Sequence, residues 1–165
     1  ALPHLRSDQL GITHNQSARG GYILGAWGDG PRSVTLLATG SEVAIAVTAA
    51  ETLERLGVSS VVVSMPCFEL FDAQNETYRQ SVLGPVDGVR IAIEAAISMG
   101  WEKYLGPRGH FIGMTGFGAS APAEDLYEHF GITAAAVATK ACQMLGINPQ
   151  YPNHPASDTQ VTRSR

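Results

Sequence analysis

Residues 33–57 read SVTLLATGSEVAIAVTAAETLERLG and pass from a strand pattern to a helix pattern. Residues 33–39 form a nearly continuous apolar run, which is typical of a strand buried on both faces. After the turn at Gly40, apolar residues follow at helical spacing up to about Leu56, and Gly57 ends the pattern. The apolar stripe of this helix consists of Val43, Ala46, Val47, Ala50 and Leu53. The stretch predicts one strand–helix unit of an α/β protein.

The same alternation recurs along the chain. Further strands are predicted at residues 22–24, 61–64, 89–93 and 110–114, and helical regions at 71–83, 97–105, 122–130 and 133–145. Buried strands that alternate with helices predict a mostly parallel sheet with right-handed crossovers and helices on its faces. We expect one domain over residues 21–147. An irregular lead-in from a preceding domain comes before it at 1–20, and a polar, disordered tail follows at 148–165.

The composition is that of a globular chain without a strongly charged binding surface. Of the 165 residues, 44% are hydrophobic and 16% are charged, and the net charge is −4. Lys and Arg are scattered, which argues against a nucleic-acid partner and an anionic membrane. No apolar run approaches the roughly 18 residues that a membrane-spanning helix needs.

The cysteines and histidines also lie apart. Cys67 and Cys142 are distant in sequence, so we expect free thiols and a reducing compartment, the cytoplasm, with an organelle left open. The five histidines never fall at metal-ligand spacing. We therefore predict no metal site.

Residues 113–125, GMTGFGASAPAED, contain the spacing G-x-G-x-x-A at Gly116, Gly118 and Ala121. A dinucleotide-binding turn needs a second strand after its helix and an acidic residue about 20 residues further on. Here one predicted helix follows another, so we predict no NAD site. We interpret the stretch as a strand-to-helix turn, in which the glycines permit unusual backbone angles and Ser120 caps the helix.

The turn after the strand at 33–39 has two interpretations. Thr39 and Glu42 stand at the spacing of a capping box, which makes the turn a structural device. The free N–H groups at a helix N-terminus also suit a small anion or another small ligand. Because Glu42 would repel an anion, we favour the structural interpretation.

Several short motifs, taken in order, resemble the C-terminal (third) domain of transketolase. The resemblance covers about residues 1–147 and depends on the order and spacing of the motifs. They are ARGGY at 18–22, ATGSEV at 38–43, SMP at 64–66, FD at 71–72, YR at 78–79, VL at 82–83, EA at 94–95, WEKY at 101–104, GMT at 113–115, FGASAPA at 117–123 and FGIT at 130–133. Gly116, which completes the G-x-G spacing, departs from the family's pattern.

This resemblance implies both a fold and a function. The fold is a three-layer α/β/α sandwich whose five-stranded mixed sheet has the order 1-3-2-4-5, with strand 1, at residues 22–24, antiparallel. Transketolases transfer a two-carbon ketol unit between sugar phosphates in the pentose phosphate pathway. They use thiamine diphosphate and a divalent metal, Mg²⁺ or Ca²⁺, which two other domains hold at a homodimer interface.

The resemblance therefore assigns no catalytic, cofactor-binding or metal-binding residue to this chain. We expect the chain to be inactive alone and to contribute, with the preceding domains of the same polypeptide, to assembly of a dimeric parent enzyme. One alternative is the same domain of a dihydroxyacetone synthase, a deoxyxylulose phosphate synthase or a 2-oxo acid dehydrogenase subunit. Another is a stand-alone module that binds a small ligand.

The implied strand order also places a topological switch point between the second and fourth strands, where open α/β sheets bind ligands. Gly40, Ser41, Glu42 and Glu94 would line this crevice, which makes them a candidate small-ligand site. We favour a structural role for both carboxylates. In that role Glu94 is largely buried and accepts hydrogen bonds from the N–H groups at residues 40–42.

Overall fold

The fold is built on a five-stranded sheet with the order β1-β3-β2-β4-β5. The computed structural model describes residues 15–148 and 151–155. Strand β1 is antiparallel to β3, and all other neighbours are parallel. The strands are β1 Tyr22–Trp27, β2 Val34–Ala38, β3 Ser60–Ser64, β4 Val89–Ile93 and β5 Gly109–Ile112. The predicted strand order and the predicted antiparallel first strand are confirmed.

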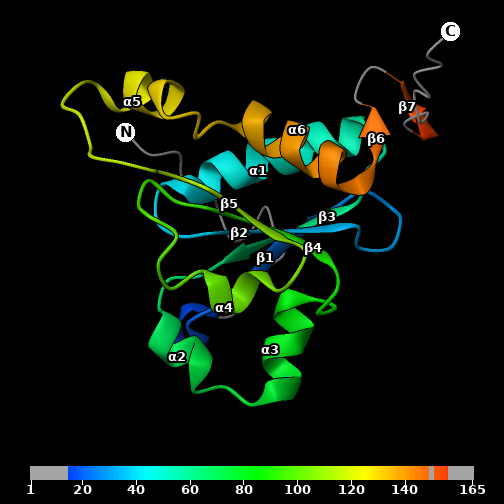
Figure 1. The fold of residues 1–165 in the computed structure, drawn as a ribbon. Helices are drawn as coiled ribbons and strands as arrows, with labels where there is room; N and C mark the ends of the chain where they lie inside the picture. Colours follow the sequence, from blue (N-terminus) through cyan, green and yellow to red (C-terminus); the bar gives the residue numbers. More distant parts are fainter. Residues whose placement is uncertain (1–14, 149–150, 156–165) are drawn as a thin grey trace, which may run out of the picture.

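Helices cover both faces of this sheet (Figure 1). Helices α1 and α6 lie together on one face, and α2, α3 and α4 lie on the other, so the three-layer sandwich is confirmed. The helices are α1 Glu42–Arg55, α2 Phe68–Asp72, α3 Glu76–Leu83, α4 Glu102–Leu105, α5 Ala123–His129 and α6 Ala134–Leu145, and a 3₁₀ turn, η1, spans Ser17–Arg19.

The central strands supply side chains to two separate cores. Leu36 and Leu37 are both fully buried, and because successive strand side chains point to opposite faces they enter different cores. Leu36 packs with the α1–α6 side, and Leu37 packs with the α2–α4 side. The continuous apolar run at 33–39 thus reflects burial on both faces. The predicted stripe of α1 is also confirmed, since all five of its residues are buried.

Several predicted boundaries differ from the structure. The predicted helical region 71–83 is two helices, because Asn75 accepts a hydrogen bond from the backbone N–H of Tyr78 and starts α3 anew. Of the region 97–105 only α4 is helical. The predicted Ser120 cap is wrong, since α5 begins after Pro122 and has no side-chain cap.

Near the C-terminus, two short strands form a separate two-stranded sheet. Strand β6, Ile147–Asn148, pairs antiparallel with β7, Tyr151–Pro155. Residues 1–14, 149–150 and 156–165, where much of the predicted lead-in and tail falls, lie outside the described residues. No helix in the described part of the chain is long and apolar enough to cross a bilayer.

We expect the 165-residue chain to unfold in one cooperative transition from a mixed α/β circular dichroism spectrum, because it carries a core on each face of its sheet. Leu37→Ala should lower the free energy of unfolding by about 2–5 kcal/mol through the cavity it leaves. Leu70, which is 46% exposed on α2, provides the matched control. Leu70→Ala should change the free energy of unfolding by about 0.5 kcal/mol or less. A flat, non-cooperative melt, or equal effects of the two variants, would contradict this account.

Candidate functional site

The four residues of the predicted crevice do not form one group. Gly40 turns the chain from β2 towards α1 with a φ of +55°, and Glu42, 6% exposed, points to the α1–α6 face. There the Tyr127 hydroxyl, from α5, donates a hydrogen bond to Glu42 Oε1 at 2.6 Å. Ser41 Oγ donates to the same carboxylate oxygen at 3.2 Å and lies 3.0 Å from the Tyr127 hydroxyl. This part of the predicted site is a closed polar contact between α1 and α5.

The predicted capping box is wrong. Helix α1 begins after Ser41, whose side chain makes no cap, and the Glu42 side chain bonds to Tyr127 instead of reaching back to Thr39. Burial and the hydrogen bond to Glu42 raise the pKa of Tyr127, so its phenol remains a donor. A buried carboxylate needs such donors, and α5 brings one within reach.

Glu94 lies on the opposite face of the sheet. The strand alternation that directs Ile93 to the α1–α6 core directs Glu94 to the other side, where the indole Nε1 of Trp101 donates to its Oε2. Glu94 is half-buried rather than largely shielded. The predicted hydrogen bonds from the N–H groups at 40–42 are therefore wrong, and so is the prediction that Glu42 and Glu94 share a crevice.

A shallow crevice of about 240 Å³ does lie beyond the carboxyl ends of β2, β3 and β4. It is lined by Thr39, Met65, Pro66, Cys67, Phe68, Glu69 and Glu94, so Glu94 alone of the four predicted residues reaches it. Hydrogen bonds from its own backbone N–H and from Cys67 lower the pKa of Glu69 and keep it ionised. Two carboxylates and no lining cation make this crevice unsuitable for an anion.

The glycine turn of residues 113–125 is not a phosphate cradle. Gly116 and Gly118 do not adopt positive φ, so the prediction that they relieve an unusual backbone is wrong. A Cβ at Gly116 would touch nothing within 4 Å. Beneath the turn lies an apolar hollow of about 230 Å³, lined by Ala95, Met114, Gly118, Ala119, Ala123, Leu126, Tyr127, Phe130 and Ile132. Helix α5 leads into α6 rather than into a strand of the sheet.

Groups that could hold a metal are also dispersed. Within the ranges that the structure describes, no three His, Cys, Asp or Glu side chains gather around a common point. Both cysteines are free thiols. Cys142 is fully buried in the α1–α6 core, and this burial raises the pKa of its thiol.

Glu94 provides a direct test of the structural role. Because the fully buried Trp101 depends on it as an acceptor, Glu94→Leu should lower the free energy of unfolding by about 1–3 kcal/mol. Glu94→Gln keeps an acceptor oxygen and should cost about 1 kcal/mol or less. Glu69→Leu removes the other carboxylate of the crevice at an exposed position and should be neutral within about 0.5 kcal/mol. Denaturant melts that show Glu94→Leu as stable as wild type would refute the role.

Comparison with known proteins identifies similar sequences and a matching family model. The model of the "Transketolase-like TK C-terminal domain" matches residues 20–133. The "Transketolase" of Sinorhizobium medicae (strain WSM419) is 56% identical over 146 residues, 88% of this chain and 20% of that protein. "Transketolase 2" of Escherichia coli (strain K12) is 48% identical over 79% of this chain and 19% of that protein.

Solved structures that resemble this chain are also transketolases. "Transketolase from Leishmania mexicana" superimposes with a TM-score of 0.69 at 41% identity, over 85% of this chain and 19% of that one. A transketolase from Pichia stipitis in complex with sedoheptulose 7-phosphate gives a TM-score of 0.70 at 33% identity, over 79% of this chain and 18% of that one. The chain spans about a fifth of the length of the relatives it matches. It belongs to the transketolase-like C-terminal domain family.

Proposed function

We propose that this chain is the C-terminal domain of a transketolase, a transferase that moves two-carbon ketol units between sugar phosphates. The observation that carries the proposal is the family match over residues 20–133 together with relatives named transketolase at 45–56% identity. These relatives, which are bacterial and chloroplastic, favour transketolase over the other thiamine-dependent enzymes and over a stand-alone binding module.

The chemistry is assigned to other parts of the parent polypeptide. About four fifths of each relative's length has no counterpart in this chain. Thiamine diphosphate and the divalent metal belong to those parts, in a cytoplasmic homodimer, and this chain is inactive alone. The described residues offer no cluster of metal ligands, and the charged side chains that line the crevice at the switch point are both carboxylates, which do not suit a diphosphate.

An assembly role is supported by apolar side chains at the carboxyl edge of the sheet. Ile97 and Met99, in the loop after β4, are 53% and 77% exposed, and Phe117, in the loop after β5, is fully exposed. Carboxyl ends of parallel strands meet at one edge of a sheet, so both loops present apolar surface there. Exposed apolar surface of this kind is typical of an interface. The proposed occupant is the preceding part of the same polypeptide.

If the chemistry belongs to the other parts of the polypeptide, the isolated chain should be inactive and the complete polypeptide should be active. The 165-residue chain should bind neither thiamine diphosphate nor NAD with a dissociation constant tighter than about 10 μM (about −6.8 kcal/mol) in calorimetric titrations. It should also show no ketol transfer, whereas the complete polypeptide with thiamine diphosphate and Mg²⁺ should be active. Tight binding or activity of the isolated chain, or an inactive complete polypeptide, would count against the proposal.

The interface can be tested by co-expressing the preceding domains and this chain as separate polypeptides. Phe117→Ser should weaken their association at least about tenfold, the equivalent of about 1.4 kcal/mol, because it removes an aromatic ring that the proposed interface would bury. Val86→Ser, at a 63% exposed position before β4 and therefore at the amino edge of the sheet, is the matched control and should leave association unchanged. Equal behaviour of the two variants would refute the proposed interface.

A further inference from the structure

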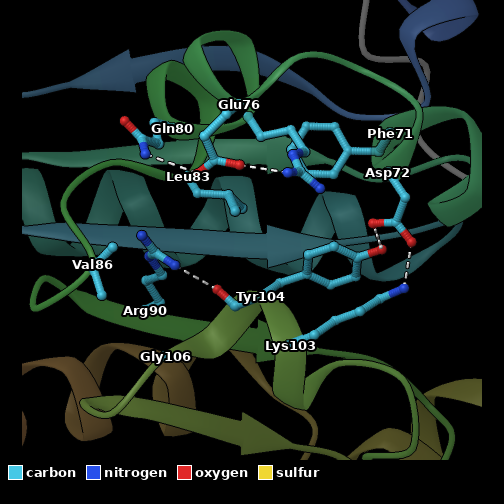
Figure 2. A pocket seen from close by; sticks show the side chains of 11 residues that line it. Phe71, Asp72, Glu76, Gln80, Leu83, Val86, Arg90, Lys103, Tyr104 and Gly106 are labelled. Carbon is cyan, nitrogen blue, oxygen red and sulfur yellow. Dashed lines mark hydrogen bonds and ion pairs between the residues drawn. The ribbon is translucent and has the colours of Figure 1, made fainter.

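A cavity of about 280 Å³ lies between α3 and α4, on the face of the sheet opposite α1 (Figure 2). It is separate from the crevice at the switch point. Its walls are Phe71, Asp72, Glu76, Arg79, Gln80, Leu83, Val86, Arg90, Lys103, Tyr104 and Gly106. Three of these side chains are cationic and two are anionic, so the balance between them decides what the cavity can hold.

Arg90 is the unusual member of this set. It is 5% exposed, and no carboxylate among the described residues forms an ion pair with it. Its Nη1 donates to the Tyr104 carbonyl at 2.8 Å, and its Nη2 donates to the carbonyls of Gly84 and Pro85 at 2.7 and 2.8 Å. Its Nε is buried without a partner. The carbonyls hold the guanidinium in place, but no carboxylate among the described residues pairs with its charge and its Nε is left without a partner.

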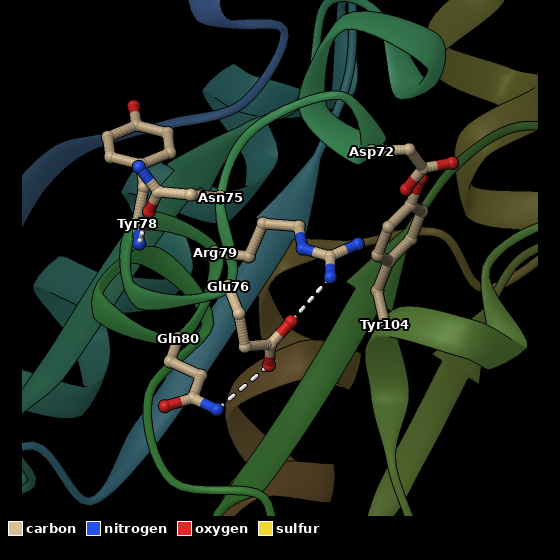
Figure 3. Close-up of polar contacts among 7 residues, drawn as sticks. All are labelled: Asp72, Asn75, Glu76, Tyr78, Arg79, Gln80 and Tyr104. Carbon is tan, nitrogen blue, oxygen red and sulfur yellow. Dashed lines mark hydrogen bonds and ion pairs between the residues drawn. The ribbon is translucent and has the colours of Figure 1, made fainter.

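Arg79 contributes a second unused donor. Its Nη2 pairs with Glu76, while its Nε is buried and has no partner (Figure 3). The side chain as a whole is 34% exposed, so it lies where a ligand could enter from solvent. Arg79 on α3 and Arg90 on β4 thus bring two guanidinium groups to one cavity, and the partly exposed guanidinium of Arg79 is the one that a ligand can reach.

The two carboxylates of the cavity are already occupied. Asp72 accepts from Lys103 at 2.5 Å and from the Tyr104 hydroxyl at 3.0 Å, and Glu76 accepts from Arg79 and, at 2.8 Å, from Gln80. Burial raises the pKa of Tyr104 to about 12, so its phenol stays protonated and donates to Asp72. Each carboxylate oxygen has a donor, and the pairs Asp72–Lys103 and Glu76–Arg79 cancel in charge. Arg90 remains as the excess.

Arg32 adds a further positive charge near the C-terminal end of α3. It donates to the carbonyl of Val82 at 3.0 Å, again without a carboxylate partner among the described residues. Burial, and then the positive charge of Arg90, lower the pKa of Arg32. Both arginines donate to carbonyls at the C-terminal end of α3, where the helix dipole is negative and favours a cation.

We propose that this cavity binds a small oxyanion of the phosphate or phosphate-monoester class, with the partly exposed guanidinium of Arg79 as its donor and the buried charge of Arg90 beside it. Planar guanidinium groups match tetrahedral oxyanions well, and an anion would compensate the unpaired charge of Arg90. The volume is near the lower end for ligand pockets, which suits a small metabolite. The source of the phosphate group is either inorganic phosphate or a small phosphorylated metabolite.

Titration of the chain with sodium phosphate and with glycerol 3-phosphate, at an ionic strength matched by sodium chloride, tests the site. We expect saturable binding with a dissociation constant of about 1 mM or tighter, and a rise in the unfolding temperature that chloride does not reproduce. Glycerol 3-phosphate binding about tenfold tighter than inorganic phosphate would identify a phosphorylated metabolite, whereas equal or weaker binding would identify free phosphate. If the isolated chain lacks a cooperative transition, the same titrations are made on the complete polypeptide, where binding that Arg79→Gln weakens is assigned to this cavity and binding that it leaves unchanged is assigned to other sites.

Matched arginine variants separate a specific site from general charge. Arg79→Gln should weaken phosphate binding about tenfold, because it removes a charged donor. Arg55→Gln removes the same charge from an exposed position on α1, on the other face of the sheet, and should leave binding unchanged. If Arg79→Gln does not fold, Arg79→Lys keeps the charge, loses the planar donor and should show the same weakening. No saturable binding below about 10 mM, or equal effects of the Arg79 and Arg55 variants, would overturn the proposal.

Discussion

Burial of β2 and β4 on both faces is the constraint from which the rest of the structure follows. A strand in this position needs apolar side chains that point both ways, as Leu36 and Leu37 do, and it needs helices on each side. The chain moves one way across the sheet from β2 to β3 and the other way from β3 to β4 and β5. Because crossovers between parallel strands are right-handed, these opposite directions place α1 on one face and α2, α3 and α4 on the other.

The same constraint decides how buried polar groups are satisfied. Glu42 begins α1 on one face of the sheet, and the alternation along β4 directs Glu94 to the other face, so each must find a donor on its own face. Glu42 finds Tyr127, which is 85 positions away in sequence, and Glu94 finds Trp101. Arg90, at an inward position of β4, finds only carbonyls. Both carboxylates thereby gain hydrogen-bond donors, and Arg90 is left as a buried cation without a carboxylate partner among the described residues.

The carboxyl edge of the sheet and the cavity between α3 and α4 consequently have different properties. At the carboxyl edge lie two carboxylates in a shallow crevice, and exposed apolar loops lie nearby, which suits contact with another part of a protein better than an anionic ligand. The arginine-lined cavity lies under α3 and α4, away from the switch point. In this domain, therefore, the crevice at the switch point, where topology predicts a ligand, and the cavity that Arg90 lines are two different sites.

The sequence by itself determined the α/β class, the positions of the five strands and the apolar stripe of α1, because these depend on the local periodicity of apolar residues. The motif order also implied the strand order that the structure confirms. The sequence could not determine the split of residues 71–83 into two helices, the partners of Glu42 and Glu94, or the cavity around Arg90. Those depend on which side chain reaches a given face from a distant segment. Sequence spacing does not encode that geometry, and only the packing of α3, α4 and α5 against the sheet decided it.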